Sequence, residues 1–173
     1  MTANTRREFS VLRKIRLQSD KEKNIMGGAE IFAVVSGLGI DGKPLVKVLD
    51  MPWLDHDKKD YSPNMDLVDW SEWSSSHVNI QLFEDDDDTD FGKLAGTLLT
   101  GVQKGLASSP ATTPYAAVGK IGELILGAMD PKWFKNDVDY VDSYYLIERG
   151  KKYAGHAGAA GNATVTIEPH TVG

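Results

Sequence analysis

Acidic side chains gathered in short runs are the residues of this sequence that could do chemistry. One run follows a strand-like segment from Glu84 through Asp90, a second spans Asp137 to Asp142, and a looser third spans Asp55 to Asp60. Carboxylate oxygens are hard ligands. Ca²⁺ accepts about six to eight of them in loose geometry, whereas Mg²⁺ needs fewer in a strict octahedron. The chemistry that these residues favour is therefore calcium binding.

The sequence gives less support to catalytic motifs and to other types of metal site. The chain has no cysteine, which excludes disulfides, thiolate metal sites and cysteine nucleophiles. Phosphate-loop, dinucleotide and serine-hydrolase motifs are absent, and an EF-hand starting at Asp86 would have Phe91 in place of the turn glycine. His56 lies between Asp55 and Asp57, so a metal-dependent hydrolase stays open beside the reading of a solvated histidine. No enzymatic activity is expected.

Composition limits the class of protein. A chain of 173 residues with 41% hydrophobic content fits one domain with a single core. The formal net charge of −6 argues against nucleic acid as a partner. No apolar run reaches the length of a membrane span, and residues 1–20 contain no apolar signal-peptide core.

Hydrophobic periodicity predicts the elements that carry these acids. Period-two alternation and β-rich runs predict seven strands, near residues 9–17, 30–35, 45–49, 65–70, 77–83, 143–148 and 163–168. Helical spacing over 93–106 and 118–129 predicts a helical hairpin inserted at about residues 92–130. The predicted fold class is mainly β: an antiparallel β-sandwich with an inserted helical hairpin, forming one domain over residues 1–173.

Strand order predicts where the acids meet. Antiparallel strands place successive connections at alternate ends of the fold, so the first, third and fifth connections share one end. These connections hold more than half of the 25 acidic residues, whereas the opposite ones hold mainly Lys43, Arg149, Lys151 and Lys152. Like charges at close range repel unless they are paired, protonated or bridged by a cation. We therefore expect a divalent ion, although solvated acidic loops are the plainer alternative. The candidate ligands are Asp20, Glu22, Glu30, Asp55, Asp57, Asp60, Glu84, Asp85, Asp86, Asp87, Asp88, Asp90, Asp137, Asp139 and Asp142.

The segment from Val78 to Gly92 resembles the strand-and-loop signature of C2 domains, in which an alternating strand ends in a D-x-D loop. Asp85, Asp87 and Asp90 match that spacing, and a slipped register would use Asp86 and Asp88. Further segments resemble a bacterial family of uncharacterised proteins with C2-like domains, namely residues 27–32, 60–64, 82–87, 136–143 and 158–165.

This resemblance implies a C2-like calcium-binding domain in a protein that is secreted or at the cell surface of a bacterium. Because no signal peptide is visible, a cytoplasmic location also stays open. The partners that it implies are the calcium ion and, beyond it, membrane lipid or another protein.

Two functions compete with the hydrolase reading. The first is a calcium-binding module with a structural or targeting role. The second is a calcium-dependent peripheral membrane-binding or membrane-perturbing protein, in which Trp53, with Met51 and Leu54, forms an exposed apolar tip. The small-residue spacing of the helices favours packing of the hairpin on itself or on the sandwich over insertion into a membrane.

Overall fold

The structure is a computed structural model that describes residues 6–21, 29–85, 89–129 and 138–173. These residues form eight strands, two α-helices and a single-turn 3-10 helix. Their bounds are β1 Arg7–Leu17, β2 Ile31–Leu38, β3 Pro44–Met51, β4 Met65–Asp69, η1 Trp70–Glu72, β5 His77–Asp85, α1 Phe91–Ser108, α2 Pro114–Ala128, β6 Val138–Glu148, β7 Tyr153–Ala157 and β8 Ala163–Val172.

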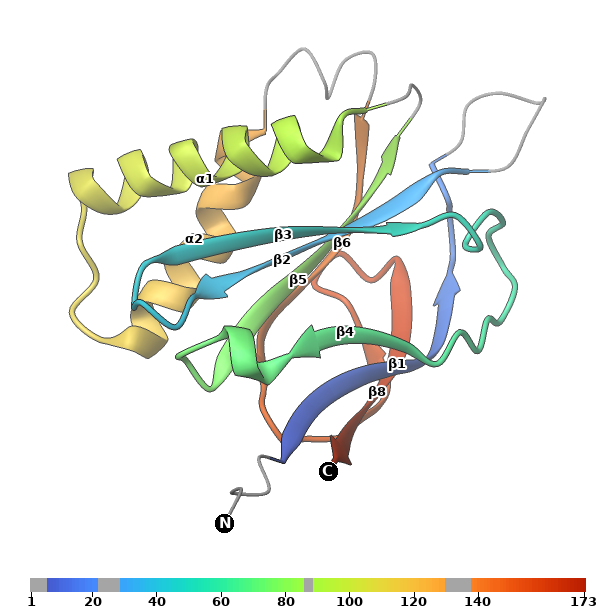
Figure 1. Cartoon of the computed structure of the whole chain (residues 1–173). Coiled ribbons are helices and arrows are strands. Elements are labelled where there is room, and N and C mark those ends of the chain that lie inside the picture. The colour runs from blue at the N-terminus through green and yellow to red at the C-terminus, as the bar shows by residue number, and fades with distance from the viewer. Residues whose placement is uncertain (1–5, 22–28, 86–88, 130–137) are drawn as a thin grey trace.

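The strands form two antiparallel four-stranded sheets, in the orders β4-β1-β8-β7 and β3-β2-β5-β6. Apolar side chains from both sheets form one core, and α1 and α2 cover the outer face of the β3-β2-β5-β6 sheet with a second core (Figure 1). The predicted mainly-β antiparallel sandwich with a helical insertion is confirmed.

Strand β5 shows how one strand serves both cores. Val78, Ile80 and Leu82 join the core between the sheets, while Phe83 joins the core beneath the helices. Alternation on a strand sends successive side chains to opposite faces, so a strand covered on both sides is buried throughout. Its whole length after His77 is buried.

One strand, β7, is missing from the prediction, which treated residues 150–161 as a loop. Tyr153 to Ala157 pair with β8 and return the chain to the opposite end of the sheet. Their side chains are mostly exposed, so no apolar alternation marks the strand. As a result, the turn at residues 158–162 lies at the end of the sheet where β1 ends and β8 begins.

The strand registers place the strand ends that flank the acid-rich connections at one end of the sandwich, which we name the acidic pole. The last residue of β1 pairs with the first of β8, the last of β3 with the first of β2, and the last of β5 with the first of β6. The segment after β3 links the two sheets there, because Ala29 N donates to Asp55 O and Lys58 N donates to Leu17 O.

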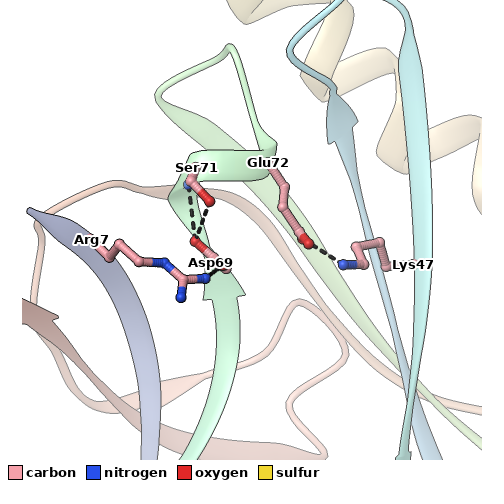
Figure 2. Close-up of polar contacts among 5 residues, drawn as sticks. All are labelled: Arg7, Lys47, Asp69, Ser71 and Glu72. Atoms are coloured by element: carbon pink, nitrogen blue, oxygen red, sulfur yellow. Dashed lines mark hydrogen bonds and ion pairs between the residues drawn. The ribbon is translucent and has the colours of Figure 1, made fainter. Parts of the chain in front are cut away.

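Charges at the opposite pole are largely paired. Asp69 caps η1 by accepting hydrogen bonds from the backbone N (3.1 Å) and the hydroxyl (2.7 Å) of Ser71, and it also pairs with Arg7 of β1 (Figure 2). Lys47 of β3 pairs with Glu72 of η1 (Figure 2), so η1 is tied to both sheets.

Candidate cation-binding site

A cleft of about 400 Å³ opens at the acidic pole, where β2 begins, β3 and β5 end and α1 begins. It is lined by Ala29, Glu30, Asp50, Pro52, Asp55, Asp85, Thr89 and Phe91. Four of these residues carry carboxylates, and none of the described residues that line the cleft is Lys, Arg or His. The cleft therefore concentrates negative charge and oxygen atoms.

Backbone hydrogen bonds bring the four acids together from separate segments. Asp85 N at the end of β5 donates to Glu30 O just before β2 (2.8 Å), and Ala29 N donates to Asp55 O (3.0 Å). Asp50 lies one residue before the end of β3 and pairs in register with Phe32 of β2. Sheet pairing thus places carboxylates that are up to 55 residues apart in sequence (Glu30 to Asp85) around one opening.

The carboxylates of Asp85 and Asp90 accept hydrogen bonds at the N-terminus of α1. Asp85 is 4% exposed and accepts hydrogen bonds from Thr89 N (3.0 Å) and Thr89 Oγ1 (2.7 Å). Asp90 is the N-cap residue and accepts from Lys93 N (3.1 Å). Asp85 lines the cleft from this position, whereas Asp90 does not.

Asp55 is held by two side chains of its own loop. Its Oδ1 contacts His56 Nδ1 at 2.9 Å and accepts a hydrogen bond from Tyr61 OH at 2.9 Å. The hydrogen bond with His56, followed by the one from Tyr61, lowers the pKa of Asp55. A carboxylate at the rim of the cleft is thereby kept ionised to lower pH than usual.

Replacing Tyr61 with Phe tests this contact. The substitution removes the hydroxyl while the ring can still pack on Trp53, so we expect the pKa of Asp55 to rise toward its ordinary value. Because a lowered folded-state pKa stabilises the fold above the unfolded-state value, the variant should lose some stability at neutral pH and less at acidic pH. An NMR pH titration of the Asp55 carboxyl measures the shift. Tyr115→Phe is the control, and an unchanged Asp55 titration in Tyr61→Phe would contradict the assignment.

Other candidate ligands have different surroundings. Asp60 pairs with Lys14 (3.5 Å) and Arg16 (3.6 Å) of β1. Asp142 is fully buried within β6, and its carboxylate accepts four backbone N–H groups, from Ser143, Ala160, Asn162 and Ala163. Neither lines the cleft, and hydrogen bonds or ion pairs within the protein already satisfy both carboxylates.

The remaining candidates divide into two groups. Asp20, Asp57, Glu84 and Asp139 are described but do not line the cleft. Glu22, Asp86, Asp87, Asp88 and Asp137 lie outside the described residues. Sequence reasoning placed Asp50 at this pole without counting it as a ligand. The signal that could have singled it out is its position in β3, because residue 50 lies on the same face of the strand as Val46 and Val48.

The predicted exposed apolar tip is wrong. Met51 and Leu54 are fully buried in the core between the sheets. Trp53 is half-buried and packs against Tyr61 with tilted rings, at a ring-centroid distance of 5.9 Å. Tertiary packing absorbs these side chains because the segment after β3 folds back over the edge of the sandwich. No helix within the described ranges combines the length and apolar character needed to cross a membrane.

The types of donor in the cleft suit calcium, because all are carboxylate or hydroxyl oxygens. These carboxylates are far apart, however. Across residues 6–21, 29–85, 89–129 and 138–173, no three acidic or histidine side chains lie close enough together to hold a metal ion. The cleft therefore gathers carboxylates at one opening without forming a metal-binding cluster among the described residues.

A protein-family model described as "Protein of unknown function (DUF3103)" matches residues 1–173. No curated protein and no solved structure matches the chain.

Proposed function

We propose that this chain, which belongs to the DUF3103 family of proteins of unknown function, is a calcium-binding β-sandwich module with a structural or targeting role. The observation that supports the proposal is the cleft at the acidic pole, which is lined by four carboxylate-bearing residues. The C2-like signature around Asp85 supports the same reading.

Repulsion between the cleft carboxylates is the physical reason to expect a bound cation. At the opposite pole Asp69 and Glu72 pair with Arg7 and Lys47, so the charges of these two acids are compensated within the protein. Four carboxylate-bearing residues gathered around one cleft repel each other, and a divalent ion between them would relieve that repulsion. The net charge of −6 adds to the attraction for cations.

The residues that would hold the ion are Glu30, Asp50, Asp55 and Asp85, with the Thr89 hydroxyl and water completing the shell. Because these side chains must adjust before they enclose an ion, we expect weak binding, in the range of roughly 10⁻⁴–10⁻³ M that is typical of extracellular calcium modules. Asp50 and Asp55 are the residues to test first, since Asp85 also holds Thr89 at the start of α1.

Thermal unfolding in calcium tests the proposal. A ligand at 100 times its dissociation constant stabilises the native state by about 2.7 kcal/mol, so saturating calcium should raise Tm by several degrees over a chelator. We expect Asp50→Asn and Asp55→Asn to reduce this rise. The matched control Asp66→Asn alters an exposed acid on β4 and should keep it. Equal Tm values in calcium and chelator would remove the proposal.

A targeting role adds a second measurement. Co-sedimentation with anionic and neutral liposomes, each with calcium and with chelator, measures calcium-dependent attachment to lipid. Binding that requires calcium and is lost in Asp55→Asn would favour the peripheral membrane-binding alternative. Calcium binding without liposome binding would favour a structural role.

A metal-dependent hydrolase is the second candidate, on one specific observation. His56 contacts Asp55 through Nδ1, which leaves its Nε2 available as a base beside the cleft. Turnover of phosphoester or ester substrates that His56→Ala abolishes would support it. Turnover that His56→Ala leaves unchanged would exclude His56 as the base.

A further inference from the structure

An exposed isoleucine lies at the tip of the β2–β3 hairpin, at the pole opposite the cleft. Ile40 is 77% exposed, the most exposed large apolar side chain of the described residues. Its neighbours make the turn: Gly42 N donates to Gly39 O (2.8 Å), Gly42 has φ 76°, and Asp41 Oδ1 accepts from Lys43 N (2.9 Å). The turn therefore needs nothing from an apolar side chain at position 40, which leaves this exposed side chain able to contact a partner.

An apolar groove of about 360 Å³ lies beside this hairpin. Leu38 and Pro44 form one wall, and Leu106, Pro110, Pro114 and Ala117 of the α1–α2 region form the other. None of its described lining residues is charged. Figure 1 shows the β2–β3 hairpin and the α1–α2 connection side by side at one end of the molecule.

The walls of the groove are held by local hydrogen bonds. Ser74 N donates to Leu38 O (3.0 Å) on the hairpin side. On the helix side Thr113 caps α2 by accepting from Ala116 N (3.1 Å), and Lys120 Nζ donates to Ser109 O. A groove that exists before binding spares an incoming side chain the entropy cost of forming it.

We propose that this groove receives Ile40 of a second copy of the chain, so that two copies associate through their β2–β3 hairpins about a two-fold axis. The hairpin supplies both the protruding residue and one wall of the groove. A two-fold interface requires such self-complementarity, because a contact from one copy is repeated in reverse by the other.

The charges beside Ile40 favour a second copy over a lipid surface. Asp41 and Lys43 flank the tip, one acid and one base, and a two-fold axis can bring each opposite its counterpart in the partner. Anionic headgroups would be repelled by Asp41 and by the net charge of −6. The same surface is thus electrostatically complementary to itself.

Sedimentation equilibrium over a range of protein concentrations tests the association. The natural chain should form dimers, and Ile40→Asp should weaken dimerisation at least tenfold, because it places a charge in an apolar groove. Folding should not change, since Ile40 contacts solvent. The matched control Val172→Asp alters another exposed apolar residue, 49% exposed at the end of β8, and should leave the dimer intact.

Crosslinking gives a geometric readout, since the chain has no cysteine of its own. A mixture of Ile40→Cys and Ala111→Cys copies, oxidised with copper phenanthroline, should form disulfide-linked dimers faster than a mixture of Val172→Cys and Ala111→Cys. A monomeric natural chain at every concentration, or dimers that Ile40→Asp does not weaken, would overturn the proposal. So would a monomer whose binding to liposomes depends on Ile40, which would assign the tip to lipid.

Discussion

Replacing Asp142 with alanine is expected to lower the free energy of unfolding by roughly 3–5 kcal/mol, the range found when one partner of a buried charge interaction is removed. The carboxylate is fully buried and accepts four backbone N–H groups at 2.7–2.8 Å. Without it, buried donors of the 158–162 turn and of β8 lose their acceptor, and each unsatisfied donor costs about 1–3 kcal/mol. Chemical denaturation measures the loss, and Tm should fall by about 6–20 °C.

The position of Asp142 explains the size of this effect. The side chain belongs to β6 in one sheet and holds the turn that leads into β8 in the other, so it joins the two sheets at the acidic pole. Gly158 permits this contact, because a Cβ at that position would lie 2.2 Å from the Asp142 carboxylate. Asp66→Ala, at an exposed position on β4, is the control with the same change of side chain. A loss in Asp142→Ala no larger than in this control would show that water replaces the carboxylate.

Replacing Gly122 with alanine is expected to destabilise the protein by about 1–3 kcal/mol, although alanine is the better helix former by about 1 kcal/mol. A Cβ at this position in α2 would lie 2.8 Å from Asn79 Cγ and 2.8 Å from Tyr145 Cδ1. Asn79 cannot move away, because its Nδ2 donates to Val118 O (2.7 Å) and its Oδ1 accepts from Leu146 N (3.2 Å). The added methyl group must therefore lift α2 from the sheet.

Gly96 provides the matched control in the neighbouring helix. A Cβ there meets nothing within 4 Å, so Gly96→Ala should stabilise the protein by about 0.5–1 kcal/mol through helix propensity. The same substitution is thus expected to have opposite signs at the two positions, as measured by urea unfolding. Equal effects would mean that α2 does not rest on Asn79 in solution.

Local patterns in the sequence determined the fold class and the general location of the acids. Alternation in segments such as 77–83 and helical spacing over 93–106 depend on neighbours along the chain, so they identified strands, a helical hairpin and antiparallel order. Antiparallel order then required the connections to alternate between two ends, which placed Asp50, Asp55 and Asp85 at the same pole. Strand β7 escaped prediction because its exposed side chains carry no apolar period.

Only the tertiary structure decided which carboxylates face the cleft. Asp60 pairs with Lys14 and Arg16, and Asp142 accepts hydrogen bonds from N–H groups about twenty residues later in the chain. None of these partners can be recognised from the local sequence. Burial of Met51 and Leu54 likewise depends on packing between two sheets. Charge and hydrophobicity belong to each residue alone, whereas pairing and burial depend on neighbours that folding brings from elsewhere in the chain.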